Sequence, residues 1–349
     1  MKTLIFSALF FSAVLLVLSG CSSSRKSFSP SKKFSPEQLR EDYSLFRKIL
    51  EDVHPSLYWY ASKDSIDYYF DEGYRRIRDS MSEPGFRTLL SYVLARVNCG
   101  HTTSRYSSDF SHFLEIARLR TFPLSVKIWK DTMVVTANLN RKDSILRRGT
   151  PILSINGRKQ QDIVDSLSKF ISSDGYNDVA KHQQLSNRGT FAGWYRNVYG
   201  LSDKFTIEYL DSNGIIGTTT IPVYDPAKDT TAFPVGPQIK FSKKEIRKQR
   251  RFITRNLQVD TLFNTAYMTL GSFSRGNKLN SFFHRSFKLL EKRKINNLVI
   301  DVRGNGGGDA SLSTLLTRYL IDHSFKIADS LYANRRSSNY GKYIDKQFL

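Results

Sequence analysis

The sequence predicts a mixed α/β chain in several regions: a helical N-terminal module, a strand-rich middle domain and a C-terminal α/β core. The spacing of the apolar residues carries this prediction. They recur at helical spacing between residues 37 and 116, and they alternate with polar residues between 118 and 225. From residue 257 onward, strand-like runs alternate with helical ones. The chain has 349 residues, 40% of them hydrophobic, which is enough for more than one core.

The N-terminal residues predict export and attachment to lipid. Lys2 precedes an apolar run from residue 4 to residue 18, and Leu18-Ser19-Gly20-Cys21 resembles the end of a bacterial lipoprotein signal peptide. A single-pass anchor is the alternative, but the run is short for a membrane span. We expect residues 1–20 to be the signal peptide, Cys21 to carry lipid and residues 21–36 to form a tether.

The residue after the cysteine bears on where the protein resides. Ser22 is compatible with sorting to the outer membrane, again by resemblance to bacterial lipoproteins. We therefore expect a lipid-anchored protein of the cell envelope, on the periplasmic face of the outer membrane. Cys99 would then be the only thiol outside the lipid anchor, which leaves no intramolecular disulfide.

The net charge of +21 does not predict a nucleic-acid partner. Basic residues are spread along the chain, and the densest run, residues 243–251, falls in an expected linker over residues 226–256 without an aromatic stacking platform. We interpret this run as a solvated linker, with attraction to anionic lipid headgroups as a second possibility.

The helical module is expected over residues 37–116. Ser35-Pro36-Glu37-Gln38 has the composition of a capped helix start, and His54-Pro55 ends that helix. Two further helices are expected, one ending near Ile77 and one ending at Asn98-Cys99-Gly100.

The strand-rich domain is expected over residues 118–225. Two strands lie on either side of Lys130-Asp131, and a hairpin over residues 204–223 turns at Asp211 to Gly214. Between them, "GTPILSING" (residues 149–157) precedes a helical stretch from Gln161 to Phe170. The pattern predicts a small strand-rich domain with one helix.

The C-terminal core contains four glycines in five positions, between a strand and a helix. Leu298 to Val302 is an apolar run that predicts a strand buried on both faces, and Asp309 is placed to cap the helix that follows. Such a loop aims free backbone N–H groups at one point, so it can hold an anion. Asp309 stands where phosphate-binding loops need Lys or a small residue, which disfavours both phosphate motifs. An oxyanion hole and a turn without a ligand remain.

Three segments resemble the tail-specific, or C-terminal processing, serine proteases and their tricorn-like relatives. They are "LVIDVRGNGGG", "GTPILSING", which is similar to the core of a PDZ domain, and "AYMTLGSF". The resemblance implies a PDZ-like domain over residues 118–225 and an incomplete ClpP/crotonase-like catalytic core over residues 257–349. It also implies a serine-type peptidase that hydrolyses peptide bonds in polypeptides.

The resemblance assigns roles to residues of this sequence. It implies that Gly306 and Gly307 donate to the oxyanion, and that Asp301, Arg303 and Asn305 fix the loop. In "VNCGHTTSRY" it places His101 where the tricorn-like branch has its general base, although a lone histidine after a helix is otherwise usually structural. We expect no metal and no organic cofactor, since the histidines show no paired metal spacing.

The nucleophilic serine of this family lies well after the glycine loop, and no matching turn occurs before Leu349. Ser311 and Ser313 fall in the helix after the loop, and Ser337 and Ser338 have the context of a solvated loop. We expect this chain to correspond to the first two thirds of a tricorn-like protease. The alternative is a periplasmic lipoprotein that binds peptides without hydrolysing them.

Overall fold

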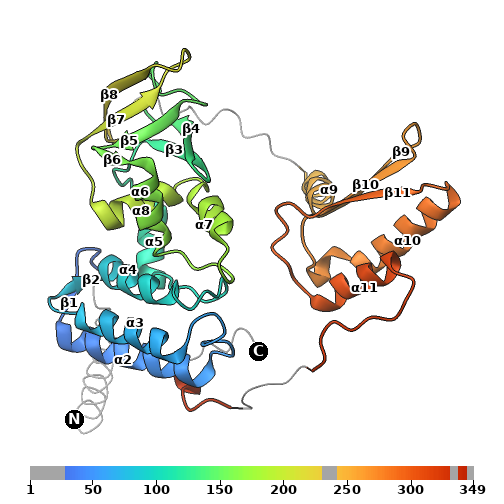
Figure 1. Cartoon of the computed structure of the whole chain (residues 1–349), viewed down its shortest axis with the longest axis horizontal. Helices are drawn as coiled ribbons and strands as arrows, with labels where there is room; N and C mark the ends of the chain where they lie inside the picture. Colours follow the sequence, from blue (N-terminus) through green and yellow to red (C-terminus); the bar gives the residue numbers. More distant parts are fainter. Residues whose placement is uncertain (1–27, 230–241, 331–336, 344–349) are drawn as a thin grey trace, which may run out of the picture. The chain divides into compact units, whose positions relative to one another are not determined.

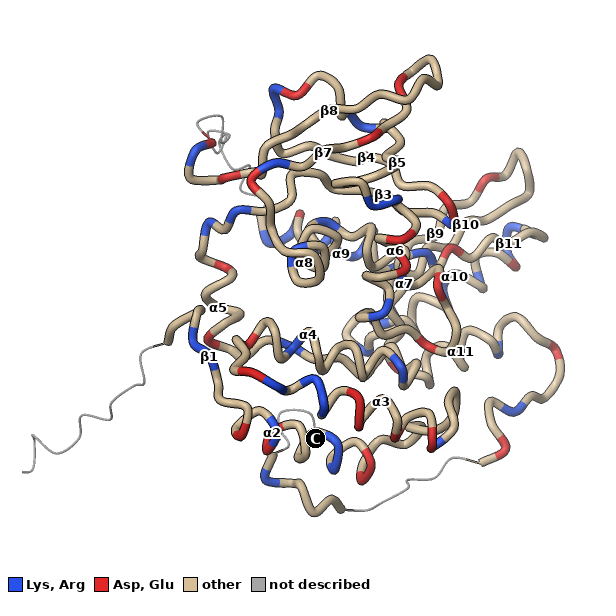
Figure 2. Tube along the Cα trace, turned by 60° about the vertical axis from the view of Figure 1, so that its left-hand side comes forward, with Lys and Arg blue, Asp and Glu red and all other residues tan. Residues whose placement is uncertain are grey.

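The computed structural model describes residues 28–229, 242–330 and 337–343. The chain forms two compact units: the first comprises residues 1–232 and 334–349, and the second comprises residues 233–333 (Figure 1). Cys21 and the expected signal peptide lie outside the described residues. Lys and Arg occur throughout both units rather than on one element (Figure 2).

The first unit begins with the helical region. Its elements, in chain order, are β1 (Lys33–Phe34), α2 (Pro36–Val53), α3 (Lys63–Arg75), β2 (Met81–Ser82), α4 (Glu83–Leu94) and α5 (Ser108–Ile116). The predicted capped start of α2 is confirmed: Ser35 and Gln38 form a reciprocal capping box. The core that joins α2, α3 and α4 consists of buried residues such as Leu39, Tyr43, Ile66, Phe70, Leu89 and Val93.

The strand-rich region forms one antiparallel sheet. Its strands are β3 (Leu124–Trp129), β4 (Thr132–Asn138), β5 (Pro151–Ile155), β6 (Arg158–Lys159), β7 (Lys204–Leu210) and β8 (Ile216–Pro222). The strand order is β3-β4-β5-β7-β8, and β6 pairs with β5. The two predicted strands around Lys130-Asp131 and the predicted hairpin over residues 204–223 are confirmed, since Trp129 pairs with Thr132 and Leu210 pairs with Ile216 next to the turns.

The prediction of one helix in this region is wrong. Three helices cover the sheet (Figure 1): α6 (Gln160–Ser168), α7 (Asp178–Leu185) and α8 (Thr190–Tyr199). The helix α8 buries Phe191 and Tyr195, whose rings pack against Phe122 and Phe205 of the sheet core. The two helices that the sequence did not predict, α7 and α8, are short. The start of α8 also lacks a side-chain cap, because the residue before it is Gly189 in the left-handed region.

The second unit contains a three-stranded sheet with helices. Its elements are α9 (Lys243–Thr254), β9 (Arg255–Asp260), β10 (Thr265–Leu270), a 3₁₀ turn (Arg275–Asn277), α10 (Leu279–Lys292), β11 (Asn297–Asp301) and α11 (Ala310–Leu320). The order is β11-β10-β9, with β10 parallel to β11 and antiparallel to β9. Met268 and Leu270 of β10 pack against Phe283 of α10 and against Leu312 and Leu316 of α11.

Two predictions for this unit need correction. The strand over residues 298–302 exists as β11, but it is not buried on both faces, because Val299 is 49% exposed. The core residues of the sheet face α10 and α11, and β11 is an edge strand. The expected linker over residues 226–256 is also not wholly irregular, since residues 243–254 form α9.

The described chain ends in a short segment that returns to the first unit. Residues 337–343 include a 3₁₀ turn (Gly341–Tyr343), and Ser338 Oγ donates to Asp52 Oδ2 of α2 at 3.1 Å. No helix within the described ranges has the length and apolar character needed to cross a membrane.

Candidate functional site

The glycine loop follows the end of β11 through a tight turn. The Asn305 N–H donates to the Val302 carbonyl at 3.0 Å, and Gly304 has φ of 74° at the third position of this turn. Glycine is favoured there because other residues rarely adopt the left-handed region. The turn redirects the chain from the sheet toward the start of α11.

Asn305 holds the loop from within. Its side-chain Nδ2 donates to the Leu270 carbonyl at the end of β10 at 2.8 Å, and its Oδ1 accepts the N–H of Gly307 at 2.8 Å. Asn305 thus links the loop to the end of β10. It also occupies the Gly307 N–H, one of the two expected oxyanion donors.

Gly308 lies against the segment that follows β10. Phe273 N–H donates to the Gly307 carbonyl at 2.9 Å, and Asp309 N–H donates to the Phe273 carbonyl at 3.1 Å. A Cβ on Gly308 would lie 2.5 Å from the Phe273 carbonyl carbon, and φ of Gly308 is 143°. Only glycine fits this close approach of two backbones.

Gly306 combines an N–H that is unbonded in the described structure with open space beside its Cα. Its N–H has no hydrogen-bond partner among the described residues, and a Cβ built on it would meet nothing within 4 Å. The N–H of Gly308 likewise lacks a partner within the described ranges. The loop therefore offers backbone donors to a group that arrives from outside.

One carboxylate lies at each end of the loop, Asp301 and Asp309, and both are ionised at neutral pH. Arg303 donates to both oxygens of Asp301, at 3.0 and 2.8 Å, and this hydrogen bonding lowers the pKa of Asp301 to about 2. Asp309 pairs with Arg275 and accepts from Ser311 N–H at 2.9 Å, which together lower the pKa of Asp309 to about 2. The predicted helix cap at Asp309 is confirmed. A negative carboxylate at this position opposes phosphate binding.

His101 lies in a turn beyond the end of α4, in the first unit. Its side chain is exposed and makes no hydrogen bond or ion pair within the described part of the chain. His101 belongs to the first unit and the glycine loop to the second.

The backbone around His101 is fixed by a loop more than seventy residues downstream. Gly100 N–H donates to Asp174 Oδ1 at 2.7 Å, Ser172 Oγ donates to the Thr102 carbonyl at 2.9 Å, and Gly175 N–H donates to the Asn98 carbonyl at 2.9 Å. A Cβ on Gly100 would lie 3.2 Å from both Asp174 carboxylate oxygens, a tight contact. Sequence reasoning missed Ser172 and Asp174, since no motif marks them.

His54 supports the same turn from the C-terminal end of α2. Its Nδ1 accepts from Ser56 N–H at 3.2 Å, so its Nε2 carries the proton and donates to Thr102 Oγ1 at 2.8 Å. Burial lowers the pKa of His54. His54 is therefore a structural histidine, whereas the imidazole of His101 is free to interact.

Three serines in or after the helix that follows the glycine loop donate hydrogen bonds within the described structure. Ser311 Oγ donates to Asp309 Oδ1 at 2.7 Å, Ser313 Oγ donates to the Ala310 carbonyl at 2.9 Å, and Ser338 Oγ donates to Asp52. Within the described ranges, no group of three His, Cys, Asp or Glu residues could hold a metal ion.

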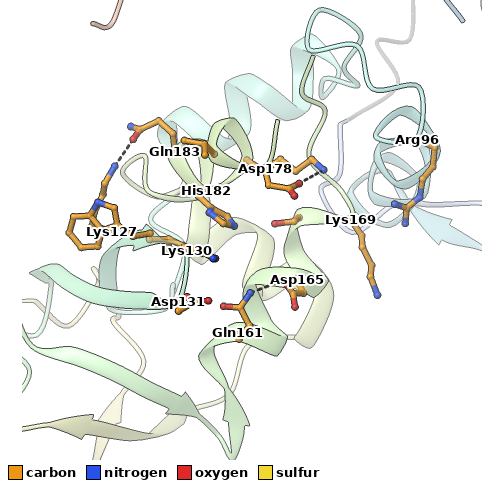
Figure 3. A pocket seen from close by; sticks show the side chains of 15 residues that line it. Arg96, Lys127, Lys130, Asp131, Gln161, Asp165, Lys169, Asp178, His182 and Gln183 are labelled. Atoms are coloured by element: carbon orange, nitrogen blue, oxygen red, sulfur yellow. Dashed lines mark hydrogen bonds and ion pairs between the residues drawn. The ribbon is translucent and has the colours of Figure 1, made fainter. Parts of the chain in front are cut away.

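A pocket of about 730 Å³ lies in the first unit, beside β3, α6 and α7 (Figure 3). Its charged lining residues are Arg96, Lys127, Lys130, Lys169, Lys181, Asp131, Asp165 and Asp178. The strand β3 is an end strand of the sheet, but its edge is partly occupied, because Ile128 N–H donates to Ser186 Oγ at 2.9 Å. A peptide that added to this edge would have to displace Ser186.

Comparison with solved structures shows the fold of the chain. Mature CPAF complexed with lactacystin matches with a TM-score of 0.51 at 13% identity, over 81% of this chain and 59% of that chain. Mature CPAF matches with a TM-score of 0.47 at 13% identity, over 79% and 56%. This chain thus spans less than two thirds of the length of either structure. The first likeness supports a mixed α/β protein with a helical N-terminal region and several sheets.

Comparison of the sequence with protein families gives a match over the region that contains the glycine loop. No curated protein sequence matches the chain. Residues 264–347 match Peptidase family S41. This range contains β10, α10, β11, the whole glycine loop and α11. The resemblance carried by "LVIDVRGNGGG" and "AYMTLGSF" is therefore confirmed for residues 264–347, which are similar to Peptidase family S41.

Proposed function

We propose that this chain is part of a serine-type peptidase that hydrolyses peptide bonds in polypeptides. The observation that carries the proposal is the state of Gly306, which lies in the range that matches family S41, has an N–H free of described partners and has open space where a Cβ would lie. A scissile carbonyl can approach such a position, and the N–H can stabilise the negative charge that develops on its oxygen.

Gly307 can serve as a second donor only after a local change. Its N–H is bound to Asn305 Oδ1, so the asparagine side chain must turn away before Gly307 can donate to an oxyanion. Of the two expected donors, Gly306 is therefore the one whose N–H is already free of described partners. Asp301 and Arg303 support the loop as a local pair at the end of β11.

His101 is the proposed general base. Histidine as a residue type exchanges protons near neutral pH, as activation of a serine hydroxyl requires. The bonds from Asp174, Ser172 and His54 fix its backbone and leave the imidazole exposed, which suits a group that must meet a substrate or a nucleophile. We assign the nucleophile to none of the described serines.

The cellular setting and the route of the substrate are also proposals. We propose that Cys21 carries lipid and anchors the protein on the periplasmic face of the outer membrane. The strand-rich region, which we interpret as PDZ-like, would deliver the polypeptide. Since Ser186 occupies the edge of β3, we place the polypeptide in the adjacent pocket, whose five cationic side chains outnumber its three acidic ones and can attract a terminal carboxylate.

The test is active-site labelling of the product of the complete reading frame, sequenced beyond the codon for Leu349. We expect a fluorophosphonate probe to label this product at a serine, and we expect His101→Ala to abolish labelling. His284→Ala, which removes an exposed histidine of α10, is the matched control and should label normally. Absence of labelling in the unmodified protein would refute the peptidase proposal.

The alternative is a lipoprotein that binds peptides without cleaving them. The engagement of the Ser311, Ser313 and Ser338 hydroxyls in hydrogen bonds favours it for the 349-residue chain. Peptide binding without turnover, together with a reading frame that supplies no further serine-bearing segment, would establish this alternative.

A further inference from the structure

The helix α9 is a defined element in a segment whose composition indicated a linker. Ser242 Oγ accepts from Glu245 N–H at 3.2 Å, and the Glu245 carboxylate accepts from Ser242 N–H at 2.7 Å, which forms a capping box. At its other end, the Thr254 carbonyl accepts from Gly271 N–H at 3.0 Å, and the chain continues directly into β9. The helix is thus attached to the second unit at its C-terminal end.

The charges of α9 lie on one side. At about 100° per residue, its six cations fall within an arc of about 160°. These cations are Lys243, Lys244, Arg247, Lys248, Arg250 and Arg251. The opposite side carries Ile246, Phe252 and Ile253, together with Glu245 and Gln249. The helix is therefore amphipathic, with a cationic face and an apolar face.

Neither face of α9 has a partner in the described structure. Ile246 is 52% exposed, Phe252 58% and Ile253 68%, and no residue of the helix is buried. None of the six cations forms an ion pair with a described carboxylate. An apolar side next to a dense cationic side has the chemistry of a helix that lies in a membrane interface.

We propose that α9 binds the surface of an anionic lipid bilayer. The side chains of Ile246, Phe252 and Ile253 enter the boundary between headgroups and acyl chains, and the six cations contact lipid phosphates. Charge complementarity favours this occupant, because six cations against one carboxylate attract an anionic surface, and the adjacent apolar side chains can enter its acyl region. The proposal does not depend on peptidase activity or on lipid at Cys21.

The test uses the full-length chain, made without acylation, and phosphatidylcholine vesicles with and without phosphatidylglycerol. Phe252→Trp places a fluorophore on the apolar face, and the unmodified chain supplies the background of its three tryptophans. We expect a blue shift and quenching by lipids brominated in the acyl chain, only with phosphatidylglycerol present. Both effects should weaken as salt is added.

A matched pair of charge variants separates the helix from general attraction. Arg247→Gln/Lys248→Gln/Arg251→Gln removes three charges from α9, and Lys142→Gln/Arg147→Gln/Arg148→Gln removes three exposed charges from the strand-rich region. We expect the first variant to lose at least roughly tenfold in vesicle affinity, and the second to change little. Equal losses in both variants would overturn the proposal. So would an unshifted fluorophore, or self-association of the chain that buries position 252 without lipid.

Discussion

At the scale of single residues, Gly306 and Gly308 lie two positions apart but tolerate different changes. Gly308→Ala should destabilise the loop by about 1–3 kcal/mol, because its Cβ would collide with the Phe273 backbone and its φ is unfavourable for alanine. Gly306→Ala should change the stability by less than about 0.5 kcal/mol, because its methyl group meets open space. Hydrogen exchange of the amides in β11 and α11 measures both effects. Equal protection in the two variants would contradict this assignment.

The same loop shows which residue roles are readable from sequence. The cap at Asp309 follows from its place before a helical pattern, and the structure confirms it. The roles of Asn305 and Gly307 depend on the orientation of the Asn305 amide, whose Oδ1 accepts from Gly307 N–H and whose Nδ2 donates to the Leu270 carbonyl, and no spacing rule specifies this orientation. The hold of Asp174 on Gly100 is a contact between residues 74 positions apart, so it depends on the tertiary structure.

At the scale of elements, the contact between α2 and the His101 turn should depend on pH. Burial lowers the pKa of His54 below the ordinary histidine value of about 6.5. Between that value and the lower native pKa, the unfolded chain binds a proton that the native chain does not, so stability falls as the pH drops below about 6.5. Above about pH 6.5, His54 is neutral in both states and its contribution to stability no longer changes with pH.

Thermal unfolding between about pH 7.5 and pH 5.5 measures this dependence. His54→Gln keeps a side-chain N–H that can donate to Thr102 Oγ1 but cannot titrate in this range. The variant should lose the part of the pH dependence that His54 supplies. An unchanged slope would show that other groups cause it.

Elements with a strong local pattern were predictable, and those defined by their neighbours were not. The hairpins of β3 with β4 and of β7 with β8 follow from alternation and turn residues. The helices α7 and α8 are short and packed on a sheet, so their stability comes from tertiary contacts. The burial of β11 was predicted wrongly, because an apolar run does not reveal whether one face or two faces are covered.

At the scale of the molecule, each unit has a core that can be perturbed by itself. Phe283→Ala should destabilise the second unit by about 3–5 kcal/mol, because Phe283 is fully buried between α10 and β10. Phe205→Ala should do the same in the strand-rich core of the first unit. Hydrogen exchange should show lost protection in β10 and β11 for the first variant, and in β5 and β7 for the second. Loss in both sets from one substitution would contradict separate cores.

The hydrogen bond between Ser338 and Asp52 has a consequence for biosynthesis. It joins residues 286 positions apart, and the second unit lies between them in the chain. A ribosome must therefore translate the whole second unit before the last described segment of the first can reach α2. The first unit contains a contact that can form only late in synthesis. The second unit consists of one continuous stretch, residues 233–333, and can fold as soon as that stretch is made. During synthesis, the glycine loop can thus form while the helical region that carries His101 still lacks the contact between residues 337–343 and α2.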